Sequence, residues 1–339
     1  MKKPLQIIYC LFLLLLPDCG NRTNQKPLTG YISGTGEFIF PPQFNFGGDF
    51  HEGMAWVALN DQRGYIDKSG AVVIQPQFEL TGDFSQGFAW IVQFGKRGFI
   101  DMKGNLVLKP QFDYAQSFSE DRAAVLVPGK KWGYINTGCT LVVDPVYSAC
   151  RAFHNGLAAV KKDSLWGYIN TSGDEVIWEQ FKEADDFSNE RALVKFSGKY
   201  GYIDRQGKTA IQPAYINAGS FSEGLANVLK DDRWGYIDTA GNVAIEFQYV
   251  LAEPFHDNAA RVYRKEMELE YINLSGQPLF RNTFERGGDF CNGLAWVVKE
   301  GNCFYIDKTG KTIISSGQFK ELRDFSEGIA RVKAVPVNE

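Results

Sequence analysis

Three histidines are the side chains of this sequence best suited to acid/base chemistry or metal binding near neutral pH. His51, His154 and His256 each directly follow a phenylalanine, at a position where six other copies of the same pattern carry Ser or Cys. If nine copies closed into a ring, these histidines would recur at every third copy, too far apart to share a zinc ion with bonds of about 2 Å. We therefore expect no metal site, and we expect these side chains to satisfy backbone groups where a strand begins.

A second recurrent feature is an Asp or Asn that follows an aromatic-Ile pair. Its members could be read as calcium ligands: Asp67, Asp101, Asn136, Asn170, Asp204, Asp238, Asn273 and Asp307. Asp and Asn interchange, and a glycine usually follows within three residues, which favours side chains that bond their own turn. No GxSxG, HExxH, Walker or strand-linked GxGxxG motif occurs. We expect no catalytic residue and no cofactor.

Four cysteines follow the leader region: Cys139, Cys150, Cys291 and Cys303. An even number in an exported chain permits two disulfides without fixing their connectivity. Each pair of neighbours lies close along the chain, so local pairing of Cys139 with Cys150 and of Cys291 with Cys303 is the first expectation.

The elements that must position these side chains repeat along the chain. The aromatic-Ile pair recurs in steps of 34 or 35 residues, beginning at residues 31, 65, 99, 134, 168, 202, 236, 271 and 305. Each copy also has a phenylalanine five residues before an alanine, as in Phe50 and Ala55, and two residues later a β-branched side chain such as Val57. Constant internal spacing of this kind identifies a repeat array.

Each repeat predicts a β-meander. Alternating apolar residues indicate a first strand in stretches such as 157–161 and a second in 166–170, and a turn containing Gly leads to a third strand such as 72–75 or 107–109. The rest, for example 112–118, is either a short fourth strand or a packed connection. With 35 glycines and 14% aromatic residues, the composition also favours an all-β protein without helices.

Several motifs together resemble one known family. Trp-Gly-Tyr-Ile-Asp/Asn occurs at 132–136, 166–170 and 234–238, and Phe-Ser-Glu-Gly-x-Ala-x-Val at 221–228 and 325–332. This combination resembles the bacterial WG (or KWG) repeat family over roughly residues 29–335. Some copies depart from it: Arg63, Arg97 and Tyr200 replace the tryptophan, and Glu270 and Phe304 replace the glycine. The resemblance implies an exported or surface-associated β-repeat protein and carries over no catalytic residue.

One repeat of about 34 residues is too small to bury a core alone, so neighbouring repeats must stack. We expect nine tandem β-meander repeats in a propeller-like ring, with an open β-solenoid as the alternative.

One strand position varies more informatively than the others. The residue between the alanine and the β-branched residue faces the opposite side of its strand, and it is Trp56, Trp90 and Trp296 in three copies. These tryptophans, in the first, second and eighth copies, would come close together only if the array closes. They could form an aromatic binding platform for a glycan or a protein, or they could be ordinary packing between repeats.

The N-terminus reads as a leader. Lys2 and Lys3 precede an apolar stretch, Leu5–Leu16, that is too short to span a bilayer but suits a signal peptide. We expect a signal peptide over 1–18, a lipid anchor on Cys19 despite the atypical Asp18, a tether over 19–28, repeats over 29–335 and a tail over 336–339. The protein would be exported and held in the bacterial cell envelope, touching the membrane only through the lipid on Cys19.

The net charge of −4 and the lack of a basic run exclude a nucleic-acid partner. Two functions remain open: a non-enzymatic surface module that binds protein or glycan, and a structural envelope scaffold without a specific ligand.

Overall fold

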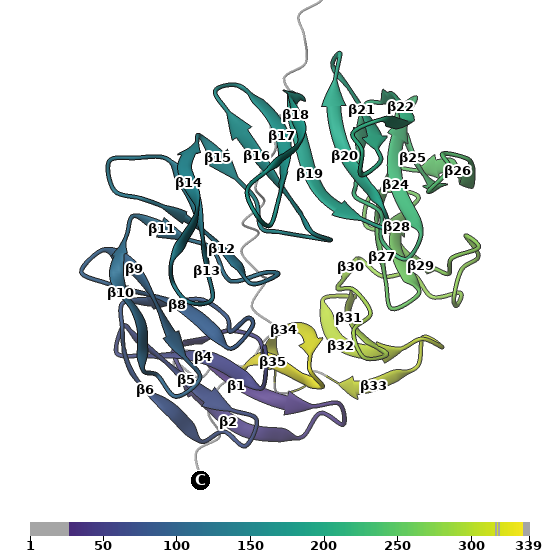
Figure 1. The fold of residues 1–339 in the computed structure, drawn as a ribbon. Coiled ribbons are helices and arrows are strands. Elements are labelled where there is room, and N and C mark those ends of the chain that lie inside the picture. Colours follow the sequence, from purple (N-terminus) through teal and green to yellow (C-terminus); the bar gives the residue numbers. More distant parts are fainter. Residues whose placement is uncertain (1–26, 316, 318, 335–339) are drawn as a thin grey trace, which may run out of the picture.

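The computed structural model describes residues 27–315, 317 and 319–334. The described chain is all-β, and its nine sheets follow one another around a closed ring (Figure 1), each sheet forming one blade of a β-propeller. The propeller-like ring is therefore confirmed, and the open solenoid is excluded. The expected leader, Cys19 and the C-terminal tail lie outside the described residues. No helix in the described part of the chain could cross a membrane.

Each blade is built from its innermost strand outward. Blade 1 has β34 (Phe319–Ser326), β35 (Ile329–Ala334), β1 (Leu28–Ser33) and β2 (Phe38–Phe44). Blade 2 has β3 (Phe46–Gly47), β4 (Met54–Leu59), β5 (Gln62–Asp67) and β6 (Val72–Phe78). Blade 3 has β7 (Leu80–Thr81), β8 (Phe88–Gln93), β9 (Lys96–Asp101) and β10 (Leu106–Phe112).

Blade 4 has β11 (Tyr114–Ala115), β12 (Arg122–Leu126), β13 (Trp132–Asn136) and β14 (Leu141–Tyr147). Blade 5 has β15 (Ala149–Cys150), β16 (Leu157–Lys162), β17 (Leu165–Asn170) and β18 (Glu175–Phe181). Blade 6 has β19 (Glu183–Ser188), β20 (Arg191–Phe196), β21 (Lys199–Ile203) and β22 (Thr209–Tyr215).

Blade 7 has β23 (Asn217–Ala218), β24 (Leu225–Lys230), β25 (Arg233–Asp238) and β26 (Val243–Tyr249). Blade 8 has only β27 (Leu251–His256), β28 (Ala259–Tyr263) and β29 (Leu269–Ile272). Blade 9 has β30 (Arg286–Gly287), β31 (Leu294–Lys299), β32 (Asn302–Asp307) and β33 (Thr312–Ser315). The stretch left open by the sequence is thus a short innermost strand followed by a packed connection.

The two ends of the chain close the ring by sharing blade 1. Strand β1 pairs antiparallel with β35, with Leu28 opposite Ala334 and Ser33 opposite Ile329. The sheet order β2-β1-β35-β34 places the first described strand between the last strand and its own neighbour. Closure in this way leaves neither chain end as an unpaired sheet edge.

Each blade turns three times, and the turns define the two faces of the ring. The first turn, such as Glu52–Gly53, joins the innermost strand to the second, and the third turn, such as 68–70, lies on the same side because the strands are antiparallel. We call this side the first-turn face. The opposite side carries the second turns, such as Asn60–Asp61, and both ends of the paired strands, Leu28 and Ala334; we call it the terminal face.

The glycine of the Trp-Gly motif exists because the outermost strand crosses close above it. A Cβ on Gly167 would lie 2.5 Å from the Ile177 carbonyl oxygen, and one on Gly235 would lie 2.7 Å from that of Ile245. The register between these two strands shifts at the same place, which is the mark of a bulge. Where Glu270 replaces the glycine, blade 8 has no regular fourth strand, and where Phe304 replaces it, β33 is shortened.

The core lies between blades. The recurrent tyrosine of one blade packs at a tilt against the recurrent phenylalanine of the next, as between Tyr65 and Phe84, whose ring centroids are 4.7 Å apart. The same tyrosine donates its hydroxyl hydrogen to a backbone carbonyl of that next blade, from Tyr65 to Gly82 at 2.6 Å. Both faces of each sheet are therefore covered by neighbours, as a ring of radial blades requires.

The first turns are also linked to one another. Glu327 of blade 1 accepts a hydrogen bond from the Gly53 N–H of blade 2 at 3.0 Å, and Glu52 accepts from Gln86 and Gly87 of blade 3. Equivalent bonds recur around the ring, ending with Asn292 of blade 9, which accepts from the Gly328 N–H. The sequence pattern marked these residues only as turn formers.

Candidate functional site

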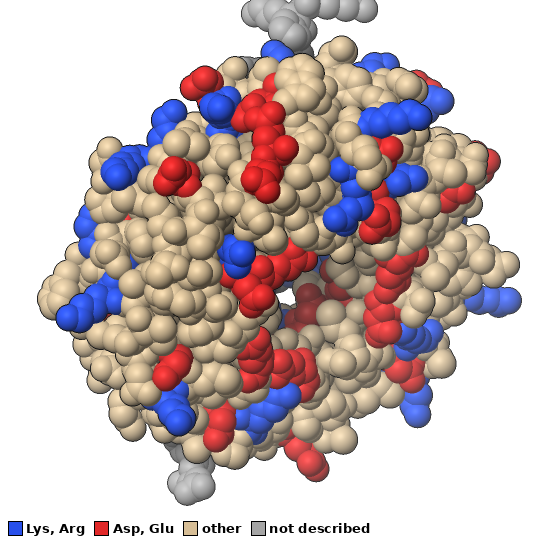
Figure 2. All heavy atoms as spheres, viewed as in Figure 1, with Lys and Arg blue, Asp and Glu red and all other residues tan. Residues whose placement is uncertain are grey.

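The residues that could do chemistry gather around the centre of the ring. They come from the innermost strand of each blade or the residues that directly follow it, and from the variable position on the second strand, which we call the slot. Figure 2 shows acidic side chains grouped around the central opening of the face in view. Near the histidines and the slot, the carboxylates are Asp49, Asp83, Asp186, Asp289 and Asp324, and they are accompanied by Arg151, Arg261 and Arg331.

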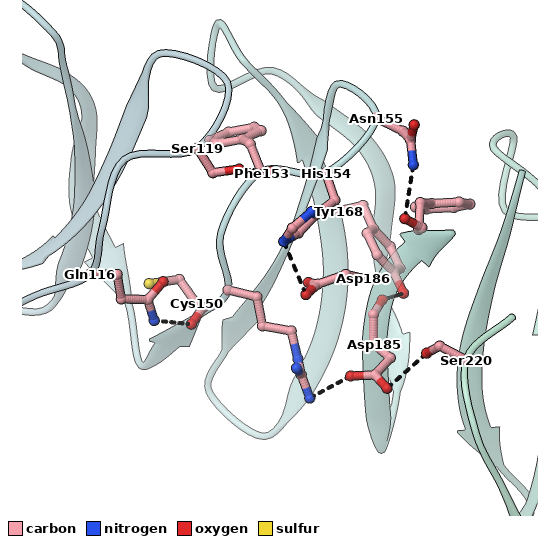
Figure 3. Close-up of polar contacts among 12 residues, drawn as sticks. Gln116, Ser119, Cys150, Phe153, His154, Asn155, Tyr168, Asp185, Asp186 and Ser220 are labelled. Carbon is pink, nitrogen blue, oxygen red and sulfur yellow. Dashed lines mark hydrogen bonds and ion pairs between the residues drawn. The ribbon is translucent and has the colours of Figure 1, made fainter. Parts of the chain in front are cut away.

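Each histidine contacts an aspartate of the following blade. His51 Nε2 lies 3.7 Å from Asp83 Oδ2, His154 Nε2 lies 3.5 Å from Asp186 Oδ2, and His256 Nε2 lies 3.8 Å from Asp289 Oδ2. Figure 3 shows the His154 pair, in which the imidazole reaches across the blade junction to the carboxylate. These distances exceed those of an aligned hydrogen bond. The contacts therefore bridge blades electrostatically and do not orient a catalytic dyad.

The histidines occupy blades 2, 5 and 8, which confirms the three-fold placement expected for a ring of nine. The expectation that they satisfy backbone groups is wrong for histidine but holds for the serines that replace it. Ser85 donates to the Phe118 carbonyl at 2.7 Å, and Ser326 donates to that of Phe50 at 2.6 Å, each across a blade junction. The signal that could have found the pairs is an Asp before the phenylalanine of the copy that follows each histidine.

The neighbourhood of His154 is a polar network that spans three blades (Figure 3). An Arg151 guanidinium nitrogen lies 2.8 Å from Asp185 Oδ1, and the other oxygen of Asp185 accepts a hydrogen bond from Ser220 at 3.0 Å. The Tyr168 hydroxyl donates to the Asp185 carbonyl oxygen. Because each polar group serves a neighbouring blade, this network holds the ring together.

Burial changes the proton affinity of several carboxylates near the centre. Desolvation raises the pKa of Asp83 and of Asp186, although the histidine beside each one lowers it. Burial also raises the pKa of Asp324 to about 6, with a further contribution from the nearby charge of Asp289. The ring thus buries ionisable groups at a cost that depends on pH.

The three slot tryptophans lie in blades 2, 3 and 9, each half-buried at a junction between blades. Closure brings them to within four consecutive blades, with Arg331 in the slot of the blade between Trp296 and Trp56. The described residues show no ring contact among the three. Each indole nitrogen lies over a glycine that directly follows the innermost strand, because a Cβ on Gly48, Gly82 or Gly288 would collide with it.

Each tryptophan is engaged by its surroundings. The Arg63 guanidinium stacks 4.1 Å from the Trp56 ring centroid and Arg97 stacks 3.8 Å from that of Trp90. Burial raises the pKa of Asp83 and of Asp324 in the following blades, and the neighbouring side chains of Trp56 and Trp296 partly oppose that shift. Each slot indole is half-buried at a junction between blades, which leaves little of it for a ligand.

The Asp/Asn series forms Asx turns, as the sequence predicts. Asp67 Oδ1 accepts hydrogen bonds from the Ser69 and Ala71 N–H groups, and Asp101 does the same with Lys103 and Asn105. Side-chain hydrogen bonds from Ser69 to Asp67 and from Asn105 to Asp101, together with these backbone bonds, lower the pKa of both aspartates. Among the described residues, no three His, Cys, Asp or Glu side chains come together in a way that could hold a metal ion.

The expected local disulfides are a wrong prediction. Cys139 and Cys150 are thiols, and so is Cys291. Cys139 occupies a turn with a positive φ of 60°, whereas Cys150 lies buried in β15, where burial raises its pKa to about 12. Burial likewise raises the pKa of Cys291 to about 11, which disfavours the reactive thiolate.

Sequence reasoning missed the outer edge of the ring. We call its exposed apolar side chains the rim patch: Val72, Val73, Leu106, Val107, Leu141, Val142, Val176 and Trp178, all on the outermost strands of blades 2–5. Trp178 is 63% exposed. At its position five other blades carry polar residues: Gln75, Lys109, Asp144, Gln212 and Glu246. That exchange of a polar residue for Trp was readable in the alignment of repeats.

Comparison with known protein families decides what the repeat is. The family model described as WG containing repeat matches residues 30–62, 64–96, 98–130, 132–166, 166–200, 200–234, 234–265 and 304–334. The chain belongs to the WG repeat family. The longest unmatched stretch between these segments, 266–303, contains Glu270 and the irregular outer part of blade 8. The WG motif is therefore lost where its fourth strand is lost.

Among solved structures, one is similar enough to support the fold. A eukaryotic initiation factor structure matches with a TM-score of 0.62 at 14% identity, over 93% of this chain and 100% of that one. BamB from Moraxella catarrhalis matches with a TM-score of 0.45 at 11% identity, over 84% of this WG repeat protein and 95% of that chain. The computationally designed Ika8 protein gives 0.45 at 14% identity, over 75% and 92%. No curated protein matches the chain.

Proposed function

We propose that this WG repeat propeller is a non-enzymatic, exported envelope protein that binds a protein partner through the rim patch. The observation that carries the proposal is Trp178, a largely exposed indole on β18 at a position that is polar in five other blades. Exposed apolar patches often mark protein interaction sites, and Trp is among the residues enriched at the hot spots of protein interfaces.

The surroundings of Trp178 support a protein more than a glycan. Two adjacent apolar residues are exposed at the start of each of three neighbouring outermost strands, as with Leu106 and Val107. They extend the exposed apolar surface beyond the indole of Trp178. A sugar would instead favour an open indole with free polar groups beside it. The slot tryptophans, which the sequence offered for that role, are half-buried at junctions between blades.

A non-enzymatic role agrees with what the reactive side chains do. The histidines bridge blades, the aspartates of the Asx series close turns, and the pKa of the Cys150 and Cys291 thiols is raised. The histidines and the aspartates that could be reactive thus have structural roles in the ring. The proposal places the protein in the bacterial cell envelope, held by the lipid expected on Cys19.

Site-specific photo-crosslinking in intact cells tests the proposal. A photoreactive amino acid replaces Trp178, and in the control it replaces Gln212, the exposed residue at the matching position of blade 6. We expect one discrete protein adduct from position 178 that weakens when Val107→Ser and Val142→Ser are added. Equal adducts at both positions, or a carbohydrate adduct at 178, would overturn it. No adduct at 178 would favour the scaffold function without a ligand.

A further inference from the structure

The terminal face of blades 2–4 exposes a second group of apolar side chains, which we call the terminal patch: Phe46, Leu59, Leu80, Phe94 and Tyr114. Phe46, Leu80 and Tyr114 are the first residues of three consecutive innermost strands, and Leu59 and Phe94 flank or form second turns. Phe94 is 87% exposed, at the tip of its turn. The patch is therefore a repeated feature of one face over neighbouring blades.

Cations accompany the aromatic rings of this patch. Lys333 Nζ lies 4.8 Å from the Phe46 ring centroid, and the Arg97 guanidinium lies 3.5 Å from that of Tyr114. Beside Phe46, a hollow of about 210 Å³ between blades 1 and 2 is lined by Arg323, Arg331 and Lys333 together with Glu321. Aromatic rings mixed with Lys and Arg are the composition of protein surfaces that sit at the headgroup level of a bilayer.

The first-turn face has the opposite character. Its innermost turns carry carboxylates that include Glu52, Glu120, Glu223, Asp257 and Glu327. An anionic bilayer would repel this face and attract the terminal face. The charge distribution thus gives the ring a preferred orientation at a lipid surface.

The chain ends point to the same occupant. Leu28 begins β1 on the terminal face. The stretch between Cys19 and Leu28 spans at most about 30 Å when fully extended. If Cys19 carries a lipid, the terminal face is the side that the anchor holds near the membrane.

We propose that the terminal patch docks on the membrane, with Phe46, Phe94 and Tyr114 in the headgroup layer and the hollow beside Phe46 over an anionic headgroup. This inference rests on the export and anchoring in the proposed function but not on the protein partner. Docking on the terminal face leaves the rim patch and the first-turn face directed away from the lipid. The membrane thus holds the ring in one orientation while its edge remains available.

Hydrogen exchange on the processed chain, isolated from the envelope and incorporated into vesicles of equal parts phosphatidylcholine and phosphatidylglycerol, tests the docking. The amides of residues 60–61 and 94–95 report on the terminal face, and those of 120–121 and 223–224 on the first-turn face. We expect vesicles to slow hydrogen exchange at the first pair of turns by about tenfold, which corresponds to about 1.4 kcal/mol. Exchange at the second pair of turns should be unchanged.

The double variant Phe46→Ser, Phe94→Ser should lose this protection, whereas the matched rim variant Trp178→Ser should keep it. A protein that stays on the vesicles with neither face protected would refute docking and leave anchoring intact. Protection of the first-turn face would refute the orientation. A chain that does not associate with vesicles would overturn both anchoring and docking, while the crosslinking at position 178 would still report on the protein partner independently.

Discussion

The substitution Gly235→Ala tests why the Trp-Gly motif exists. The added Cβ would lie 2.7 Å from the Ile245 carbonyl oxygen and 3.0 Å from the Phe247 nitrogen, both in the backbone of β26. Ordinary carbon contacts begin near 3.5 Å, so the outermost strand of blade 7 must move by several tenths of an ångström. A backbone segment in a bulge cannot rotate away as a flexible side chain can.

The cost follows from what β26 buries. Ile245 and Tyr249 anchor this strand against blade 8 and are both buried. Overpacking a filled site costs about 1–3 kcal/mol, and partial withdrawal of these two side chains places Gly235→Ala in the upper half of that range. The matched control is Gly34→Ala, where the nearest heavy atom would be 3.9 Å away and the backbone is not left-handed. We expect the control to change the free energy of unfolding by less than about 0.5 kcal/mol.

Urea unfolding gives the two free energies, and hydrogen exchange of β26 locates the damage. The expected result is a destabilised Gly235→Ala whose β26 amides exchange faster while the inner strands of blade 7 keep their protection. If Gly235→Ala were as stable as Gly34→Ala with β26 still protected, close approach of the outermost strand would not be the reason for the glycine. The loss of the fourth strand at Glu270 would then need another cause.

Three further outcomes follow from the ring. Burial raises the pKa of Asp324 to about 6 from an ordinary 3.8, so the folded state binds this proton more tightly, and the resulting stabilisation is full below pH 4 and is lost as pH rises through 6. Asp324→Asn should therefore raise the free energy of unfolding at pH 7 by about 1–3 kcal/mol and flatten its pH dependence in urea titrations. An unchanged pH profile would contradict the assignment. Trp296→Ala should destabilise the protein by about 2–3 kcal/mol because it empties a junction, whereas Trp178→Ala should change stability by less than about 0.5 kcal/mol in the same assay; the reverse ranking would show that the rim indole is structural. Asp204→Asn should leave the melting temperature unchanged with or without added calcium, since the amide oxygen accepts the same two N–H groups, and a calcium-dependent rise in the wild type alone would indicate a metal site that the Asx turn does not explain.

Most of the fold could be predicted because large aromatic side chains recur at a constant spacing. Tyr65, Phe84 and their counterparts recur at constant spacing, and each must bury against the next copy. The pairing of β1 with β35 could not be predicted. The sequence of β1 resembles that of its counterparts in other blades, such as β5, which pair with the preceding strand of the same repeat. The innermost strand could be predicted only as one of two alternatives, since two residues such as Tyr114–Ala115 leave no alternation to detect.

The candidate site was less predictable, for a geometric reason. The slot of Trp56 was correctly placed on the opposite side of its strand, but in a ring of radial blades that side is another junction and not the surface. Large apolar side chains are exposed on the outermost strands, at the turns and at strand ends, where Trp178, Phe94 and Phe46 lie. The His154–Asp186 contact links two repeats and is invisible until the repeats are placed side by side.

Closure matters most, because the faces, the rim and the three-fold histidines exist only in a closed ring. Hydrogen exchange of β1 and β35 in the full chain measures closure directly, since each strand is paired on both sides only when the two ends meet. We predict that the amides of Leu28–Ser33 and Ile329–Ala334 exchange as slowly as those of β17, a strand in the middle of the chain that is paired with β16 on one side and β18 on the other. Rapid exchange in β1 or β35 beside a protected β17 would show an open array and would contradict the ring.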